Sequence, residues 1–340
     1  MNLQDVARRA GVGTATVSRV LNGSPGVKSS TRARVLRAVE ELKYRPNLHA
    51  RTLAGGRSRV LGVVMSNLYN PFFADIYHAI ETNARQRGYE TLLANSSHDV
   101  KLLKASVNRL LGQQVAGLSV FPEMEPAILE ELREARIPVV LFDAGETVDG
   151  FTTIHFDHRR GMRMLLDLLV ALGHRRMAYV SAPLFLRPTE ERRQEFVEMT
   201  AHRGVEGSVV APVDDGFSGG REAARAVLRS GFAPTAILCV NDWVAVGVIR
   251  ELRNQGLTVP DDISVTGFDN ITIAEFCCPS LTTIHIPRSE IGRLVVAGLV
   301  PDAAGAAPPA RHVYLDPELV VRESTSLASS ARVQQAGARH

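Results

Sequence analysis

The sequence predicts a small all-α domain at the N-terminus, followed by an α/β core of two lobes that each have a parallel sheet. Three observations lead to this prediction. The chain has 340 residues, enough for two or three domains at about 100–200 residues per domain. Apolar residues recur at helical spacing through the first sixty residues, whereas strand-like apolar runs alternate with helical segments afterwards. Charge divides the chain at the same place.

The net charge of +3 conceals this division. Residues 1–60 hold 12 Lys and Arg against 3 Asp and Glu, which gives +9. The remaining 280 residues hold 27 and 33, which gives −6. A basic segment joined to a mildly acidic body indicates that only the first part contacts a polyanion.

The composition excludes several classes of protein. Hydrophobic residues make up 45% and charged residues 22% of the chain, as in ordinary globular proteins. No stretch of about 18 uncharged apolar residues is present, so we expect no spanning helix and no membrane partner. The first residues lack the apolar core of a signal peptide, and three cysteines, two of them adjacent, predict reduced thiols. We therefore expect a cytoplasmic protein.

The first two helices are marked by their ends. Asn2 with Asp5 three residues later fits a capping box, and Gly11 is expected to end the first helix. A second helix is expected from Thr14 to Asn22. Its apolar face consists of Val17, Val20 and Leu21, and its outer face of Ala15, Ser18, Arg19 and Asn22.

A third helix is expected after Ser29, Ser30 and Thr31, which are all good caps. Its inward residues are Val35, Leu36, Val39 and Leu42, and Arg32, Arg34 and Arg37 are among its outward residues. Two short helices separated by three residues, the second with a narrow polar and cationic face, are typical of a helix-turn-helix that enters the major groove of double-stranded DNA. A plain three-helix bundle is the alternative.

The motifs of this segment resemble the lactose/galactose repressor (LacI/GalR) family of bacterial transcriptional regulators. They are Asp5-Val6-Ala7, Ala10-Gly11-Val12, Thr16-Val17-Ser18-Arg19-Val20-Leu21-Asn22, Thr31-Arg32 and Tyr44-Arg45-Pro46-Asn47. The resemblance implies that residues 1–46 bind operator DNA, and Gly13 departs from the serine usual in the family. The implied DNA-binding residues are Thr14, Ala15, Thr16, Ser18, Arg19, Asn22, Lys28, Thr31, Tyr44, Asn47, Ala50, Arg51 and Leu53.

Taken alone, residues 47–58 predict a short helical stretch of eight residues followed by a flexible linker. Eight residues are too few for a stable isolated helix. In the family that the chain resembles, this segment is the hinge helix, which forms on operator DNA and inserts a leucine into the minor groove. Leu53 occupies that position and Ala50 the close-contact position. Insertion there kinks the duplex. A passive linker is the alternative.

Strands and helices alternate through the body of the chain. Strands are expected at 60–65, 89–94, 117–121, 138–142, 177–181, 208–211, 235–240 and 263–268. Helices are expected at 71–88, 99–113, 158–173, 190–203, 218–230 and 241–255. This alternation predicts parallel sheets with helices on both faces, and two such blocks predict two Rossmann-like lobes with a cleft between them.

Ligands of such sheets bind beyond the carboxyl ends of the strands. Aromatic rings there can stack on the apolar face of a sugar, while carboxylate, amide and guanidinium groups bond its hydroxyls. Each residue alone also fits a core or capping role, and Trp243 fits packing as well as a stacking wall. The candidate effector-binding residues are Asn70, Phe72, Phe73, Asp143, Arg192, Asn241, Trp243 and Asp269.

The body also resembles the repressor core, which shares its type I fold with periplasmic sugar-binding proteins. The motifs are Gly173-His174-Arg175-Arg176, Pro260-Asp261-Asp262-Ile263-Ser264-Val265, Gly267-Phe268-Asp269 and Leu281-Thr282-Thr283-Ile284. The implied core covers 59–326, with one lobe at about 59–157 and 288–318, the other at about 158–287 and 319–326, and a flexible tail at 327–340. Ala144, Glu195 and Ile286 depart from residues common in the family.

Catalytic readings of the sequence are weak. Gly216-Phe217-Ser218-Gly219-Gly220 fits the pattern of a hydrolase elbow, but that motif needs a strand running straight into the turn, and Pro212, Asp214 and Asp215 intervene. Ser218 is better interpreted as a helix N-cap. His155 and His158 lack a third ligand at metal-binding spacing. We expect no enzyme activity, no cofactor and no metal.

Taken together, the sequence predicts a homodimeric, ligand-responsive transcriptional regulator that represses genes from a near-palindromic operator. Its effector is expected to be a sugar or a sugar derivative. The alternative is an exported solute-binding protein with the same core fold and no role in gene regulation. That alternative does not account for the N-terminal helices. Whether the effector is an inducer or a corepressor stays open.

Overall fold

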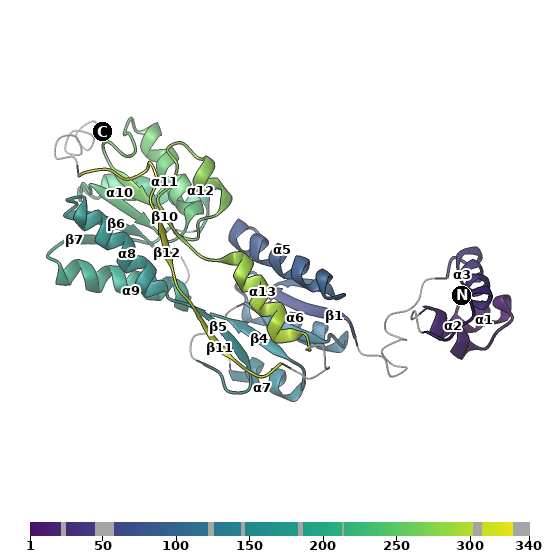
Figure 1. Ribbon diagram of the computed structural model, residues 1–340. Coiled ribbons are helices and arrows are strands. Elements are labelled where there is room, and N and C mark those ends of the chain that lie inside the picture. The colour runs from purple at the N-terminus through teal and green to yellow at the C-terminus, as the bar shows by residue number, and fades with distance from the viewer. Residues whose placement is uncertain are drawn as a thin grey trace. The chain divides into compact units, whose positions relative to one another are not determined.

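A computed structural model describes residues 1–21, 25–44, 58–121, 126–143, 147–182, 186–212, 214–301 and 308–328 (Figure 1). The chain divides into two compact units, Met1–Ser58 and Arg59–His340. Each unit has its own hydrophobic core, and the two are described separately.

The N-terminal unit contains α1 (Leu3–Ala10), α2 (Thr14–Leu21) and α3 (Ser29–Glu41). The capping box is confirmed, because the side chain of Asn2 accepts from the Asp5 N–H and the side chain of Asp5 accepts from the Asn2 N–H. Gly11 caps the end of α1 at φ 63°, in the left-handed region that glycine adopts without strain.

Side chains from all three helices close the core of this unit. Val6, Val17, Val20, Val35 and Ala38 are buried together. Two details of the predicted third helix are wrong. Leu36 is 50% exposed, because Ala38 occupies the buried face, and the N-cap of α3 is Lys28, which makes no capping bond with its side chain.

The first lobe of the core unit is a parallel sheet with strand order β11-β5-β4-β3-β1-β2. Its strands are β1 (Val60–Met65), β2 (Glu90–Asn95), β3 (Gly117–Val120), β4 (Val139–Phe142), β5 (Thr152–Phe156) and β11 (His312–Leu315). One face packs against α5 (Pro71–Gln86) and α13 (Arg288–Leu299). The other packs against α6 (Val100–Gly112) and α7 (Pro126–Glu134).

The second lobe is a smaller parallel sheet with strand order β7-β6-β8-β9. Its strands are β6 (Arg176–Val180), β7 (Glu206–Val210), β8 (Ala236–Cys239) and β9 (Ser264–Thr266). Its helices are α8 (His158–Ala171), α9 (Arg187–His202), α10 (Phe217–Arg229), α11 (Asp242–Asn254) and α12 (Thr272–Phe276). A separate antiparallel pair joins β10 (Thr283–His285) to β12 (Glu318–Val320).

The chain passes between the lobes three times, after β5, before α13 and after β11. Helix α13 therefore returns to the first lobe after the second lobe is complete, and it packs along α5 (Figure 1). Gly292 allows this contact, because a Cβ at that position would lie 2.5 Å from the Cβ of Ala79. The first lobe is thus assembled from segments on both sides of the second.

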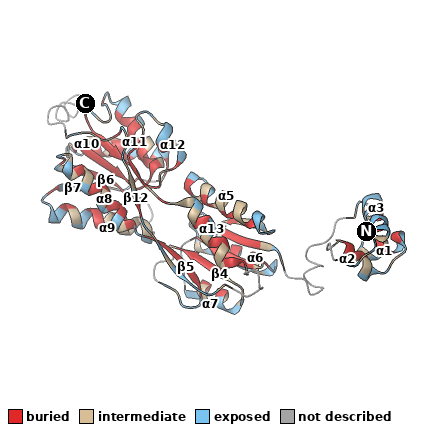
Figure 2. Ribbon diagram, in the orientation of Figure 1, coloured by how far each residue is buried: buried red, intermediate tan, exposed pale blue. Residues whose placement is uncertain are grey.

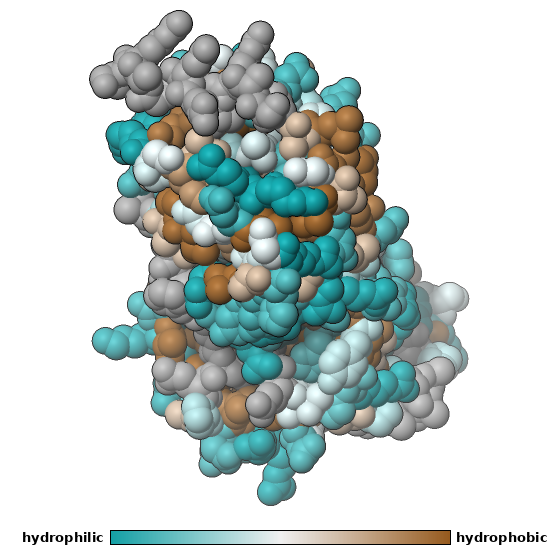
Figure 3. Space-filling model, turned by 90° about the vertical axis from the view of Figure 1, so that its left-hand side faces the viewer, coloured by the Kyte–Doolittle hydropathy of each residue, from teal (hydrophilic) through white to brown (hydrophobic). Residues whose placement is uncertain are grey.

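Burial follows these layers. Figure 2 shows the central strands of both sheets buried, with helices whose outer faces are exposed. The edge strands β2, β7 and β11 are mostly exposed or half-buried. Hydrophilic side chains predominate on the face drawn in Figure 3, where hydrophobic side chains form separate groups. Single exposed apolar side chains such as Val197 and Val209 are normal on protein surfaces and do not by themselves indicate a binding site.

The predicted alternation of strands and helices is confirmed, with differences at several boundaries. The strand expected at 263–268 is only Ser264–Thr266, and the helix expected from 190 begins at Arg187. Ser218 is not an N-cap, because α10 begins at Phe217 and is capped by Gly216. The elements that the sequence did not predict are α7, α12, α13, β5, β10, β11 and β12.

A buried carboxylate joins α10 to α11. Glu251 of α11 accepts hydrogen bonds from Arg221 and Arg225 of α10 and from Gln255, with its side chain only 2% exposed. These partners, Arg225 first, lower the pKa of Glu251 to about 2, against the opposing effect of burial. The cluster therefore holds the two helices together as an ion pair at neutral pH.

Glu251→Gln should destabilise the protein by about 2 kcal/mol at pH 7, less than a fully enclosed pair, because both arginines are more than 40% exposed. The carboxylate has a depressed pKa in the folded state, so its contribution is present above pH 4.5 and is lost as the pH falls toward 2. Chemical denaturation of wild type and variant should converge over that window. Glu206→Gln, at a 70% exposed carboxylate, should change stability by less than about 0.5 kcal/mol. A difference that persists unchanged at low pH would contradict the ion-pair account.

Candidate functional site

A cavity of about 110 Å³ lies between the two lobes of the core unit. It is lined by side chains that follow the carboxyl ends of β1, β2, β6, β7, β8 and β9 or lie in the helices that come next. The lining residues are Ser66, Asn70, Phe72, Phe73 and His98 from the first lobe, and Ala182, Leu186, Pro188, Thr189, Arg192, Asp215, Val240, Asn241 and Asp269 from the second.

The structure brings six of the eight predicted effector residues to this cavity: Asn70, Phe72, Phe73, Arg192, Asn241 and Asp269. Asp143 and Trp243 are not among the lining residues. The carboxylate of Asp143 accepts from the N–H of Phe156 at 3.0 Å and contacts His158 Nε2 at 2.9 Å. Trp243 packs edge-on against Phe217, at 5.2 Å between ring centroids.

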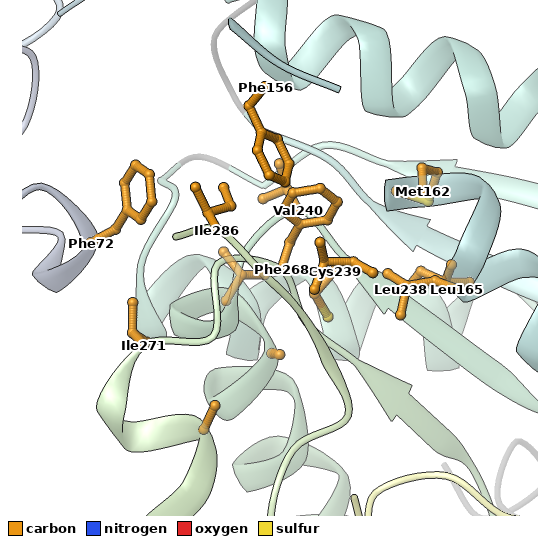
Figure 4. Packing of buried hydrophobic residues seen from close by; sticks show 14 of the residues in the cluster. Phe72, Phe156, Met162, Leu165, Leu238, Cys239, Val240, Phe268, Ile271 and Ile286 are labelled. Carbon is orange, nitrogen blue, oxygen red and sulfur yellow. The ribbon is translucent and has the colours of Figure 1, made fainter. Parts of the chain in front are cut away.

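The first-lobe wall begins where β1 turns into α5. Asn70 caps α5 by accepting from the N–H of Phe72 at 3.0 Å, and Pro71 starts the helix with the backbone angle it prefers. Phe72 and Phe73 meet edge to face, with centroids 5.1 Å apart. Figure 4 shows Phe72 reaching from α5 toward Ile286. The wall therefore offers aromatic surface beside an amide.

The second-lobe wall is centred on Arg192 of α9, which is only 7% exposed. Its guanidinium donates to the carbonyl oxygens of Pro188 and Val240 and lies 4.2 Å from the ring centroid of Phe268. These contacts fix its position through hydrogen bonds and a cation–π interaction. Asn241 is fixed too, since it accepts from the N–H of Val244 and donates to the Asp215 carbonyl.

Asp269 lies at the end of the segment that follows β9, at φ 105°, and is only 4% exposed. Arg288 of α13 donates to the carbonyls of Asp269 and Asn270 and pairs with Asp75 of α5 at 3.2 Å. Arg288 therefore ties the Asp269 segment of the second lobe to a first-lobe helix. Next to this segment, the fully buried carboxylate of Asp242 accepts hydrogen bonds from the Ile271 N–H and the Thr283 hydroxyl.

Burial raises the pKa of Asp269 to about 7, although the nearby charges of Arg192 and Arg288 act in the opposite direction and Asp215 adds to the rise. Burial, with the neighbouring Asp269, also raises the pKa of Asp242 well above its usual value. Two acidic side chains thus lie close together where water is excluded, and the protein disfavours negative charge there.

Sequence reasoning missed Ser66, His98, Thr189 and Asp215 as lining residues. Ser66 directly follows β1, and His98 follows β2 in a turn where Ser97 and His98 both have positive φ. The rule that ligands bind at strand ends would have included Ser66. Asp215 also follows a strand, β7, in the turn before α10. Thr189 carries no comparable signal, because its position depends on where α9 begins.

In the N-terminal unit, the predicted outer face of α2 is accessible. Thr14, Ala15 and Arg19 are exposed, and Thr16 and Ser18 are half-buried. Outside α2, Lys28 is exposed and Thr31 is half-buried, while Tyr44 packs against the domain core. The predicted DNA-binding residues outside the described residues are Asn22, Asn47, Ala50, Arg51 and Leu53.

Two absences hold for the part of the chain that the structure describes. No group of three or more His, Cys, Asp or Glu side chains is arranged to hold a metal ion there. No helix in the same ranges is long and apolar enough to cross a membrane.

A helix-turn-helix unit and a two-lobed core with an interlobe cavity, in one chain, define the class of ligand-responsive transcriptional regulators. Residues 2–47 match the profile of the bacterial regulatory proteins of the lacI family, and residues 166–325 match that of the periplasmic binding protein-like domain. The chain belongs to the lacI family of bacterial regulatory proteins.

Named relatives agree with this assignment over nearly the whole chain. The HTH-type transcriptional repressor CytR of Escherichia coli (strain K12) is 32% identical, covering 95% of this chain and 96% of CytR. Catabolite control protein A of Priestia megaterium is 33% identical, covering 87% and 90%. The structure of the lac repressor dimer bound to operator and the anti-inducer ONPF superposes with a TM-score of 0.82 at 31% identity, covering 96% and 99%.

Family membership confirms the predicted fold class and the prediction of a transcriptional regulator rather than an enzyme. It also decides against a solute-binding protein without a role in gene regulation, because the N-terminal match covers the helix-turn-helix unit.

Asp269→Asn should make the ligand-free protein more stable by about 1–2 kcal/mol at pH 8. The folded-state pKa of about 7 lies above the ordinary 3.8, so the contribution of this carboxyl is fully present below pH 4 and is lost as the pH rises toward 7. The amide keeps the shape and tolerates positive φ. Thermal unfolding between pH 4 and pH 8 should show a weaker loss of stability in the variant. A variant less stable than wild type at pH 8 would contradict this account.

Proposed function

We propose that this protein binds a near-palindromic operator in double-stranded DNA as a homodimer, represses transcription from it in the cytoplasm, and is controlled by a small effector. Residues 1–46 read the DNA and residues 47–58 act as the hinge. Residues 59–326 bind the effector and dimerise. The tail predicted at 327–340 lies, beyond Ala328, outside the described residues. The observation that carries the proposal is the cavity whose described lining comes from both lobes of the core.

Ligand binding in such a cavity can change the affinity of the protein for DNA. A ligand that bonds to both walls favours one lobe arrangement over another, and it changes DNA affinity only through its different affinities for the two arrangements. The chain passes between the lobes three times, which suits a hinge motion rather than separation. Arg288 adds a link between the two lobes, since it bonds Asp269 and Asn270 in one lobe and Asp75 in the other.

The charge and the shape of the N-terminal unit support DNA as the partner. Residues 1–60 carry a net charge of +9, and counterion release from phosphates favours binding of such a segment. Small and polar side chains on the exposed face of α2 fit a major groove, where arginine can bond guanine. The similar lac repressor dimer is bound to operator, and we propose the same kind of target here.

The direct test is selection of duplexes from a randomised pool with the full-length protein, followed by screening of small molecules. We expect an enriched sequence with two inverted half-sites, as a symmetric dimer requires. We also expect a compound that raises the thermal unfolding temperature and changes the affinity for the selected duplex. Enrichment of single half-sites would contradict the dimer, and no enrichment would contradict operator binding.

Arg19→Ala should weaken binding to the selected duplex by about 1–3 kcal/mol and weaken binding to random DNA by less, because arginine contributes base recognition. Arg253→Ala removes an exposed arginine of α11 in the core unit and should leave both affinities unchanged. Fluorescence anisotropy at fixed salt measures the six affinities of wild type and the two variants for the two kinds of DNA. Equal losses on the two kinds of DNA would assign Arg19 to the phosphates instead.

Arg192→Ala should abolish the effect of the screened compound on DNA binding. If the compound is an inducer, affinity for the duplex without it should stay nearly normal. If it is a corepressor, tight duplex binding should be lost. Trp243→Phe is the matched control, because Trp243 packs on Phe217 and is not among the residues lining the cavity. Normal regulation in the Arg192 variant would place the effector site elsewhere.

A further inference from the structure

We propose that the effector is an uncharged, hydroxyl-bearing molecule and that the cavity rejects its phosphorylated or otherwise anionic forms. This inference rests on the proposed function, because it assumes that the interlobe cavity is the effector site. It specifies the charge of the ligand, and so distinguishes a free sugar, polyol or nucleoside from a phosphate ester.

The charges that line the cavity carry the inference. Among the described lining residues, Arg192 is the only lysine or arginine and His98 is the only histidine, and the lining also includes two carboxyl groups, Asp215 and Asp269. A phosphate ester brings up to two negative charges at neutral pH. Sites built for phosphate groups use several cationic side chains or clusters of N–H donors, and this lining offers one guanidinium.

That guanidinium is already engaged. Arg192 donates through Nε to the Pro188 carbonyl at 3.2 Å and through Nη1 to the Val240 carbonyl. Its Cζ lies over the ring of Phe268, 4.2 Å from the ring centroid. These two bonds use two of the five N–H donors of the guanidinium, and bidentate binding of a phosphate requires two of the remaining donors to point at the anion. A single hydroxyl needs only one donor.

The acidic groups place a further penalty on anions. Asp269 is 4% exposed, and burial makes its own negative charge unfavourable. A second negative charge in the same cavity would be repelled by the carboxylates of Asp269 and Asp215, with less screening by water at buried Asp269 than at half-buried Asp215. Hydroxyl or N–H groups of a neutral ligand can instead donate to these carboxylates.

Ser66 supplies an independent sign that hydroxyl chemistry belongs here. Its side chain is fully buried and lines the cavity, and its Oγ has no hydrogen-bond partner in the structure. A buried polar group without a partner is unfavourable unless a ligand or water completes it. A ligand hydroxyl can both donate to and accept from Ser66. The aromatic side chains of Phe72 and Phe73 then suit the apolar face of a ring.

Matched pairs of compounds test this directly. The full-length protein is titrated by calorimetry at pH 7.5 with D-glucose and glucose 6-phosphate, D-ribose and ribose 5-phosphate, D-fructose and fructose 6-phosphate, and cytidine and cytidine monophosphate. Sorbitol, cellobiose and adenosine extend the neutral set. We expect at least one neutral compound to bind, and its phosphate ester, prepared if it is not in the set, to bind at least tenfold more weakly.

An ester that binds as tightly as its neutral partner would overturn the inference, and so would a neutral set in which nothing binds. DNA selection, run in parallel, separates this failure from that of the proposed function. A protein that selects a palindromic duplex and responds only to esters would keep the proposed function and lose the inference. A protein that selects no duplex would lose the proposed function, whatever it binds in calorimetry.

Asp269→Asn tests the assigned cause. Removing this carboxylate should weaken the neutral ligand and relieve repulsion of the ester, so the ratio of their dissociation constants should fall at least threefold. Asp261→Asn removes an exposed carboxylate of the same lobe and should leave the ratio unchanged. A ratio unaltered in the Asp269 variant, with the variant folded by circular dichroism, would show that other groups set the charge selectivity.

Discussion

A parallel sheet needs helices on both faces, and in the first lobe one covering helix arrives only after the whole second lobe. Helix α13 packs on the same face as α5, next to the apolar side chains of β1, β4 and β5. Without it, part of that face would be open to water. The interleaving of the lobes and their three connections accompany this return of α13 to the first lobe.

The same requirement makes the cavity residues structural as well as functional. Asn70 and Asn241 each cap the helix that they begin, so their amides are fixed before any ligand binds. Arg288 belongs to α13, yet it holds the carbonyls of Asp269 and Asn270. A change of lobe orientation therefore acts on the backbone at Asp269 through Arg288. The site is preorganised by the bonds that complete the fold.

Strand-end residues were predictable because β1, β8 and β9 are short apolar runs followed by polar residues. That rule found Asn70, Asn241 and Asp269. It could not foresee that a neighbouring histidine uses the carboxylate of Asp143, because that contact joins α8 to the end of β4. Strands β5 and β11 are short and interrupted by polar residues, so only tertiary packing defines them. Glu195, a departure noted in the sequence, is a buried partner of Arg159 and Arg163 of α8.

The return of α13 also sets the order in which this protein can fold during translation. About 225 residues separate β1 from α13, so at roughly 5–20 residues per second the ribosome needs roughly 10–45 s to supply the missing helix. Until α13 is made, the apolar side chains of α5 and of the central strands lack one of the helices that bury them. The N-terminal unit has its own core and can fold at once. Nascent chains would therefore present a finished DNA-binding unit attached to a first lobe whose apolar surface is still partly exposed.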